Sequence, residues 1–186
     1  NVINKIKTKN FIFASTGAAQ DCSSAYGISK RAAEDVVREY CTKHKKQDYT
    51  IFRFYNVIGS TVVAPTNPDG LMYNLIMAMQ SKEFTVFGND YEVSSDGTCV
   101  RDYVHVNEIC DSLKQAIEKP SNSVESLGHG VGYTVKEIVD EFQKVNKCDF
   151  EVKYGSRRKG DIASSVLKNV SPYMRNLYTM DQLLKV

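Results

Sequence analysis

The sequence of 186 residues contains no apolar run of membrane-spanning length, no internal repeat and no low-complexity segment. A membrane-spanning helix needs about 20 consecutive apolar residues, so the first absence argues against that class. The other two exclude repeat architectures and low-complexity chains. What remains is the composition of an ordinary globular protein, with 42% hydrophobic and 25% charged residues. Such a chain can bury a real core, as one large domain or two small ones.

An excess of charge of one sign is also missing. The 24 lysines and arginines are balanced by 22 acidic residues, and the net charge is +2. A dedicated nucleic-acid binder concentrates positive charge, so we expect no nucleic-acid partner and, without a spanning segment, no membrane. The one basic cluster, at residues 43–46, falls at the expected C-terminal end of a helix. Cations suit the helix dipole there, and we interpret the cluster as a solvated helix end.

Cysteine pairs and spaced histidines are absent as well. The five cysteines are odd in number and widely spaced, and the sequence has no Cys-x-x-Cys motif and no signal-peptide pattern. This pattern predicts free thiols and a cytoplasmic, reducing location. His105 and His129 lack a ligand partner at metal-site spacing, so no metal is expected. Because the first residue is asparagine rather than methionine, we expect the chain to be a piece of a longer one.

The apolar pattern of the first third predicts a strand, a helix and a second strand. Residues 11–14 form a short apolar run typical of a buried parallel strand, and residues 49–55 form another. Between them a helical pattern continues to Tyr40, with Ser23 or Ser24 as its cap. A unit of this kind indicates an α/β fold with a parallel sheet.

Residues 56–70 are rich in proline and glycine and are predicted to form a long loop. We therefore divide the chain into domains at residues 1–68 and 69–186, with part of the second packing back on the first. Residues 128–132 lack the Gly-x-Gly-x-x-Gly spacing, so they are interpreted as a structural turn rather than a dinucleotide loop. Further elements predicted by apolar spacing are helices at residues 71–81, 107–118 and 135–145 (the last capped by Thr134), strands at 85–87, 100–104 and 150–154, and a short helix near Met180.

Tyr26 and Lys30 are four residues apart at the start of the predicted helix. This spacing places both side chains on one helix face, where the ammonium favours the ionised phenol that can act as a base. By itself the spacing is weak evidence, because a solvated helix face carries the same pattern. Thr16 ends the first predicted strand, and ligands of open α/β sheets bind at that edge.

Six blocks in this order resemble the extended short-chain dehydrogenase/reductases, and within them the UDP-galactose (UDP-glucose) 4-epimerases. The blocks are Asn10-Phe-Ile-Phe-Ala-Ser-Thr16, Tyr26-Gly-x-Ser-Lys30, Arg53-Phe-Tyr-Asn56, Phe87-Gly-Asn-Asp-Tyr91, Asp96-Gly-Thr-x-Val-Arg-Asp-Tyr-Val-His-Val106 and Arg157-Arg-x-Gly-Asp161. The resemblance implies the C-terminal part of a Rossmann-like doubly wound parallel sheet plus a smaller α/β nucleotide-sugar-binding domain. The implied activity is NAD-dependent epimerisation at carbon 4 of a UDP-hexose or UDP-N-acetylhexosamine.

The resemblance also implies which residues handle the sugar and NAD. Tyr26 would take the proton from the hydroxyl at carbon 4 while hydride passes to NAD, and Lys30 would hold the nicotinamide ribose. Thr16 stands where the family usually has serine, and its hydroxyl would donate to the sugar oxygen; otherwise it is an ordinary strand-end hydroxyl. Tyr55 matches an aromatic residue that touches the nicotinamide, although its pattern alone fits the core equally well.

For the UDP part, Arg101 and Arg158 match the two arginines on the diphosphate, whose forked guanidinium suits that group. Asp161 matches the acid that accepts from the uridine ribose hydroxyls, and Ser165 stands where many epimerases carry a bulky tyrosine. An alternative for Arg101 is a buried pair with Asp102. The other residues implied to contact the substrate are the diphosphate-side amide Asn56, the residue Leu71, and the wall against the uracil, Thr85, Val86 and Phe87, which by pattern alone would be plain core.

The chain departs from the family in one large respect. The family begins with a strand and a Gly-x-x-Gly-x-x-Gly loop that seats NAD, and this sequence contains no such loop. NAD would need that missing part for full binding, supplied by a complementing N-terminal chain; a homodimer is the other expected assembly. Whether the chain is an enzyme is therefore open. The alternatives are a non-catalytic UDP-sugar-binding remnant and another nucleotide-sugar enzyme of the family, such as a dehydratase.

Overall fold

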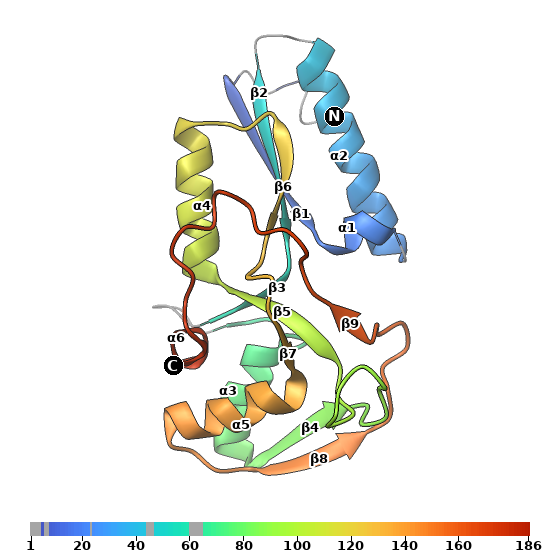
Figure 1. Cartoon of the computed structure of the whole chain (residues 1–186), viewed down its shortest axis with the longest axis vertical. Helices are drawn as coiled ribbons and strands as arrows, with labels where there is room; N and C mark the ends of the chain where they lie inside the picture. The colour runs from blue at the N-terminus through green and yellow to red at the C-terminus, as the bar shows by residue number, and fades with distance from the viewer. Residues whose placement is uncertain (1–4, 6–7, 23, 44–46, 60–64) are drawn as a thin grey trace.

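The computed structural model describes residues 5, 8–22, 24–43, 47–59 and 65–186. Ser23 as a helix cap, residues 44–46 of the basic cluster, and residues 60–64 of the predicted loop lie outside the described residues. Among the described residues, no helix is long and apolar enough to cross a membrane. The chain folds as an α/β protein in which parallel strand pairs predominate, as the sequence predicts (Figure 1).

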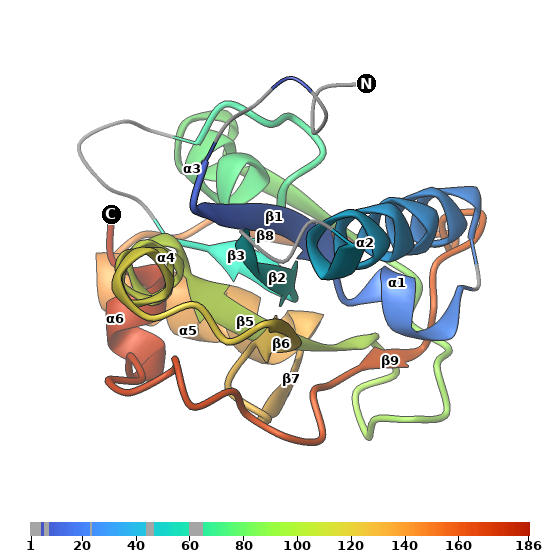
Figure 2. The same ribbon diagram turned by 90° about the horizontal axis from the view of Figure 1, so that it is seen from above.

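The first sheet contains three parallel strands in the order β1 (Asn10–Thr16), β2 (Asp48–Phe54) and β6 (Ser123–Leu127). Helix α2 (Ala25–Lys43) covers one face and helix α4 (Val106–Glu118) the other (Figure 2). Successive side chains of a strand point to opposite faces. Ile51 of β2 accordingly belongs to the core under α2, while the next residue, Phe52, belongs to the core under α4.

Helix α2 begins with a cap that the sequence predicts. The Ser24 hydroxyl accepts a hydrogen bond from the Gly27 backbone N–H at 3.0 Å, which satisfies a donor that the first helical turn leaves free. A short helix that the sequence did not suggest, α1 (Ala18–Asp21), packs against this turn. A Cβ atom on Gly27 would lie 2.3 Å from the Ala18 carbonyl oxygen, so glycine permits the close approach of the two helices.

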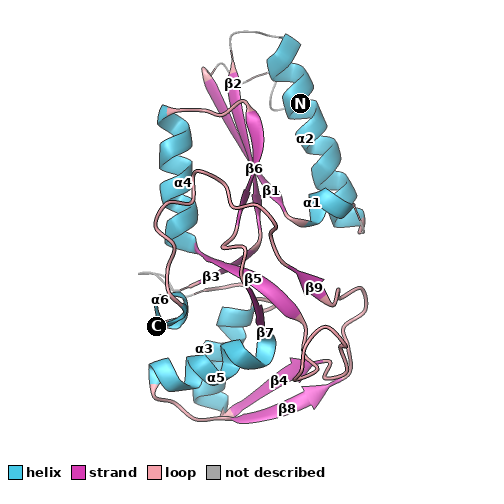
Figure 3. Ribbon diagram, viewed as in Figure 1, coloured by secondary structure: helices cyan, strands magenta, loops and turns pink. Residues whose placement is uncertain are grey.

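A second layer is built around a two-stranded parallel sheet of β4 (Glu83–Phe87) and β8 (Glu151–Gly155), beside helices α3 (Leu71–Ser81), α5 (Val135–Asn146) and α6 (Met180–Leu184) (Figure 3). Thr134 caps α5 as predicted, its hydroxyl accepting from the Glu137 N–H at 3.0 Å. Residues that are fully or almost fully buried join these elements into one core: Leu75, Val86, Ile138, Val139, Phe142, Leu183 and Leu184.

Strand β5 (Val100–His105) lies between the two layers. It pairs with β3 (Asn56–Ile58) and β9 (Ser164–Ser165) in parallel and with β7 (Gly132–Thr134) in the antiparallel sense. Because three partner segments from distant parts of the sequence meet on β5, the residues of this strand are fixed relative to both layers.

The structure contains strands that the sequence did not predict. The loop predicted at residues 56–70 contains β3, and neither β7 nor β9 was expected. Strand β6 was missed altogether, since its sequence Ser-Val-Glu-Ser-Leu carries little apolar signal. Strand β6 and helix α4 pack with β1 and β2. The proposed boundary after residue 68 itself stays a prediction.

Candidate functional site

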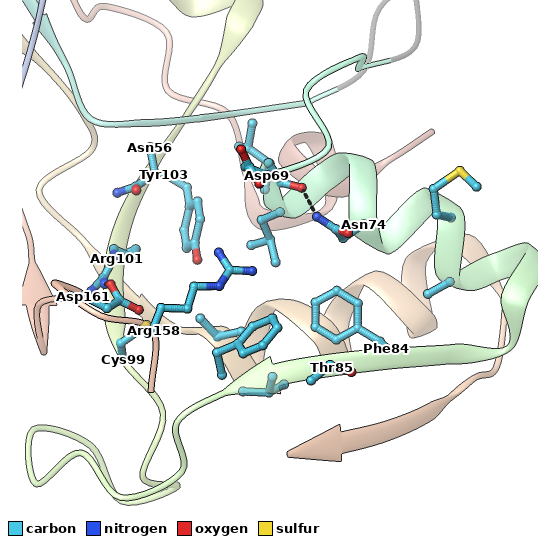
Figure 4. Close-up of a pocket in the computed structure, with 18 of the residues that line it drawn as sticks. Asn56, Asp69, Asn74, Phe84, Thr85, Cys99, Arg101, Tyr103, Arg158 and Asp161 are labelled. Carbon is cyan, nitrogen blue, oxygen red and sulfur yellow. Dashed lines mark hydrogen bonds and ion pairs between the residues drawn. The ribbon is translucent and has the colours of Figure 1, made fainter. Parts of the chain in front are cut away.

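The larger of two adjoining cavities has a volume of about 640 Å³ and is bordered by α3, β4 and β5 (Figure 4). Every residue predicted to contact the substrate, except Ser165, contributes to its lining: Asn56, Leu71, Thr85, Val86, Phe87, Arg101, Arg158 and Asp161. These residues come from five separate segments of the chain. The structure therefore brings together side chains that the sequence could only suggest one by one.

A second cavity of about 280 Å³ is lined by Thr16, Tyr55 and Ser165, among others. Asn56, Arg101 and Asp161 line both cavities, so the two spaces meet at these residues. The carboxyl ends of β1 and β2 lead directly to Thr16 and Tyr55, which is the edge where open parallel sheets bind ligands. A ligand with two unlike parts can occupy such a pair of adjoining cavities.

Arg101 forms an ion pair with Asp161 through its Nη2 atom, and its Nη1 atom donates to the Val100 carbonyl oxygen at 2.8 Å. The two paired side chains are 12% and 24% exposed. The alternative, a buried pair of Arg101 with the adjacent Asp102, is wrong. Neighbouring side chains of a strand point to opposite faces, so the two cannot meet.

Asp102 is fully buried and anchors backbone instead. Its carboxylate accepts from the N–H groups of His129 at 2.7 Å, Gly130 at 2.8 Å and Leu167 at 3.1 Å. Burial raises the pKa of Asp102, and these three hydrogen bonds only partly offset that effect. A Cβ atom on Gly128 would lie 2.8 Å from this carboxylate. Two N–H groups of the glycine-rich turn are thus engaged by Asp102, which fits the expected structural turn rather than a phosphate loop.

Arg158 points into the larger cavity (Figure 4). Its guanidinium carbon lies 4.2 Å from the centroid of the Phe87 ring, a cation–π arrangement. Arg158 forms no ion pair with any residue that the structure describes. Its positive charge is consequently available to an anionic ligand in the cavity.

Tyr26 and Lys30 lie close to each other but line neither cavity. The Lys30 ammonium is 6.0 Å from the centroid of the Tyr26 ring and donates to the Ala14 carbonyl oxygen at 3.0 Å. Tyr26 is 57% exposed. Their catalytic roles, like that of Thr16, stay predictions.

A buried carboxylate on α2 was missed by the sequence analysis. Glu34 is fully buried and accepts from Arg53 Nε at 2.9 Å, from Arg53 Nη2 at 2.6 Å and from the Ser15 hydroxyl at 2.6 Å. Burial disfavours its charge, but the hydrogen bonds from Arg53 and Ser15 outweigh burial and hold the pKa of Glu34 below its ordinary value. Ser15 and Arg53 each stand close to a predicted site residue, Thr16 and Tyr55. The sequence did contain a signal for this buried pair, because Glu34 is a charged residue on the face of the predicted helix that packs on the sheet.

The two histidines in the described part are structural. His129 Nε2 lies 2.9 Å from each carboxylate oxygen of Glu108. His105 stacks on Tyr178 with ring centroids 4.6 Å apart. Burial lowers the pKa of His105, against the opposing effect of Glu108. Within the described ranges, no group of three or more His, Cys, Asp or Glu side chains could hold a metal ion.

Comparison with known proteins gives a consistent result. The profile of the NAD dependent epimerase/dehydratase family matches residues 1–129. The UDP-glucose 4-epimerase of Haemophilus influenzae is 30% identical over 182 residues, which cover 83% of this chain and 54% of that protein. The UDP-glucose 4-epimerase of Rhizobium meliloti is 34% identical over 155 residues, covering 77% and 47%. The chain therefore spans about half the length of these curated relatives.

Solved structures agree on the fold. A UDP-glucose 4-epimerase from Thermotoga maritima with UDP-glucose superposes with a TM-score of 0.80 at 26% identity, covering 97% of this chain and 62% of that one. A UDP-glucose 4-epimerase from Bifidobacterium longum in complex with NAD⁺ and UDP gives a TM-score of 0.83 at 24% identity, covering 98% and 63%. At its lower identity, the second likeness concerns the fold alone.

Proposed function

We propose that this chain, which belongs to the NAD dependent epimerase/dehydratase family, is the substrate-binding and catalytic-helix portion of a UDP-sugar 4-epimerase. The fold would then be the C-terminal part of a Rossmann-like doubly wound sheet, with a smaller nucleotide-sugar-binding layer. The observation that carries the proposal is the junction of the two cavities at Arg101 and Asp161. The larger cavity would take the nucleotide and the smaller one the sugar.

The chemistry of the larger cavity supports a nucleoside diphosphate. Arg158, which has no ion pair with the residues that the structure describes, offers a guanidinium whose planar fork can hold two phosphate oxygens at once. Phe87 lies on β4 and is 37% exposed, beside Thr85 and Val86 in the lining. An aromatic face of this kind can pack against a flat base. Asp161 supplies an acceptor for hydroxyl groups.

In the smaller cavity, Thr16 and Ser165 are the proposed contacts of the sugar. A small side chain at Ser165 leaves room for an N-acetyl group, so UDP-N-acetylhexosamines should fit as well as UDP-hexoses. Calorimetry should give dissociation constants for UDP-N-acetylglucosamine and UDP-glucose within about threefold of each other, an energy difference below about 1 kcal/mol. Much weaker binding of UDP-N-acetylglucosamine would refute this specificity.

The residues present fit the nicotinamide end of NAD in part. Thr16 and Tyr55 line the smaller cavity, while Tyr26 and Lys30 lie in the N-terminal part of α2 and line neither cavity. NAD, when bound, would accept and return a hydride at carbon 4 of the sugar. The residues of this chain would hold the sugar, donate a hydrogen bond from Thr16 and move the hydroxyl proton at Tyr26. The sequence holds no glycine-rich loop for the NAD diphosphate, so we propose that NAD binding needs residues beyond these 186.

A second candidate function is a UDP-sugar-binding protein without catalysis. The observation that favours it is the position of the proposed base: Tyr26 is largely exposed, and the Lys30 ammonium is engaged by the Ala14 carbonyl. Both functions share the nucleotide site and differ only in whether NAD is used. The proposed dehydratase alternative would need a further acid beside Thr16, where Gly17 and Ala18 stand.

Calorimetry on the 186-residue chain tests these functions. Both predict that UDP binds, so a chain that does not bind UDP refutes both. An epimerase portion should bind NAD when a complementing N-terminal part of a family member is added, and should then convert UDP-glucose to UDP-galactose. Binding of UDP without NAD binding or conversion under that condition would favour the non-catalytic function.

A further inference from the structure

One buried carboxylate joins the three elements that lead to the smaller cavity. Glu34 of α2 accepts from Arg53 of β2, at 2.9 Å from Nε and 2.6 Å from Nη2, and from the Ser15 hydroxyl of β1 at 2.6 Å. Ser15 and Arg53 are register partners in the parallel pair of β1 and β2, so their side chains lie on the same face of the sheet. The Glu34 carboxylate therefore ties both strands to the helix at one level.

This tie lies directly before the residues that line the smaller cavity. Thr16 follows Ser15, and the segment after Arg53 supplies a second wall. Six of the twelve lining residues come from the two strand ends and the start of α2, namely residues 16–18, Ser24, Phe54 and Tyr55. In the described part of the chain, no residue of β1, β2 or α2 lines the larger cavity. A shift of α2 on the two strands should thus alter the smaller cavity and spare the larger one.

Glu34 also fixes the helix that carries the proposed base. Tyr26, Lys30 and Glu34 are spaced by four residues, which places them along one side of α2. The Lys30 ammonium donates to the Ala14 carbonyl oxygen at 3.0 Å, one turn before Glu34. Contacts on two successive turns hold both the rotation of α2 about its axis and its position along β1.

Stability alone does not account for an ion pair at this place. Removing a carboxylate and a guanidinium from water is costly, and apolar residues of similar volume often stabilise a core equally well. The forked guanidinium, however, holds both carboxylate oxygens in one planar arrangement. An apolar contact tolerates small shifts of a helix, whereas the pair of Glu34 and Arg53 favours a single alignment.

Building on the proposed function, we infer that Glu34 is a positioning residue for the sugar end of the substrate. Through Ser15 and Arg53 it sets two walls of the smaller cavity. Through α2 it sets Tyr26 and Lys30 against the strand ends. Glu34 itself lines neither cavity, so it acts on the ligand only through the residues that it holds.

The test compares the binding of UDP and of UDP-glucose to the 186-residue chain by calorimetry at pH 7. UDP reports on the larger cavity, and the glucose of UDP-glucose reports on the smaller one. In Glu34→Gln the dissociation constant of UDP-glucose should rise at least about fivefold, because the sugar contacts are displaced. The dissociation constant of UDP should stay within about twofold of the wild-type value. A general loss of structure would weaken both ligands alike.

The matched control is Glu108→Gln. Glu108 is also a buried carboxylate, which accepts from the backbone N–H groups of His105 and Tyr178 at 2.7 Å each, and it lines neither cavity. The control removes the same charge from a similarly buried place and should leave both dissociation constants within about twofold of the wild type. Selective weakening of UDP-glucose in Glu108→Gln would overturn the inference, because the loss of any buried carboxylate would then produce it.

Arg53→Lys separates geometry from charge. Lysine keeps a positive charge beside Glu34 but lacks the fork that holds both carboxylate oxygens. UDP-glucose should therefore bind Arg53→Lys at least about threefold more weakly than the wild type, with UDP within about twofold. Circular dichroism verifies that each variant folds, and Arg53→Lys decides the question if Glu34→Gln does not.

Two results would overturn the positioning role of Glu34. One is UDP-glucose binding as tight as in the wild type in a folded Glu34→Gln or Arg53→Lys variant. The other is an equal weakening of UDP and UDP-glucose in these variants. Failure of the wild type to bind UDP would instead refute the proposed function, so the two failures are distinguishable.

Discussion

At the scale of single residues, neighbouring side chains on one strand point to opposite faces and make different kinds of contact. Arg101 faces the cavities and meets Asp161, while Asp102 faces the interior and holds three backbone N–H groups. The same alternation operates on β1, where buried Ser15 joins Glu34 and the next residue, Thr16, lines the smaller cavity. Arg101 and Thr16 thus each follow or precede a buried neighbour that ties their strand to the rest of the fold.

Arg158 should carry much of the affinity for UDP. Arg158→Gln removes the available cation, so the dissociation constant for UDP should rise about 10- to 100-fold in calorimetry. The matched control is Arg157→Gln, because Arg157 is engaged by Asp90 at 2.7 Å and stacks on Tyr91 outside the cavities. Its loss should alter the UDP affinity by less than about twofold. Equal losses in the two variants would mean that Arg158 acts only through net charge.

Glu34 should make the stability of the chain depend on pH. Its pKa in the folded state lies below the ordinary value of 4.5, so its contribution is present above pH 4.5 and is lost as the pH falls through the folded pKa. At pH 7, Glu34→Gln should lower the free energy of unfolding by about 3 kcal/mol, because it leaves Arg53 without its buried partner. The difference between wild type and variant should shrink below pH 4.5.

Urea unfolding at a series of pH values measures this effect. Glu39→Gln on the same helix is the control, because Glu39 forms an exposed pair with Lys43 at 2.6 Å. Exposed pairs of this kind contribute less than about 1 kcal/mol. A difference between wild type and Glu34→Gln that stayed constant from neutral to acid pH would contradict the role assigned to the Glu34 charge.

At the scale of elements, α2 is held at both its start and its middle. Ser24 caps its first turn, Gly27 allows α1 to pack against it, and Glu34 joins it to β1 and β2. Tyr26 and Lys30 lie between these fixed points. The position of the proposed base relative to the strand ends therefore depends on these contacts as well as on the hydrogen bond from Lys30 to the Ala14 carbonyl oxygen.

Gly27→Ala tests the close approach of α1 and α2. Alanine favours a helix over glycine by about 1 kcal/mol, which alone would stabilise the chain. Here the added Cβ would lie 2.3 Å from the Ala18 carbonyl oxygen, so we expect a net loss of about 1–3 kcal/mol in urea unfolding. Ser29→Ala, an exposed change on the same helix, should stay within about 0.5 kcal/mol of the wild type. A Gly27→Ala variant as stable as the wild type would show that α1 moves away freely.

At the scale of the whole molecule, the cavities exist because two layers meet on β5. The parallel sheet with α2 and α4 supplies Thr16 and Tyr55, and the layer around β4 and α3 supplies Phe87 and Leu71. Strand β5 and the segment leading to β9 contribute the residues at the junction. A ligand bound across this junction would touch both layers.

The α/β class, helix α3 at its observed bounds and the Ser24 and Thr134 caps followed from the sequence, as did eight of the 21 residues that line the larger cavity. Apolar periodicity and capping are local signals, and matching sequence blocks mark residues of a site even when distant elements must bring them together. This is why those predictions did not need coordinates.

How the charges pair is seen only in the folded structure. Arg101 meets Asp161, 60 positions away, rather than its neighbour Asp102, and Glu34 meets Arg53 through the packing of a helix on a sheet. Strands β3, β6 and β9 also needed the structure, because short or polar strands are defined by their partners rather than by their own sequence. Pairing across the fold depends on distances and burial that no local pattern encodes.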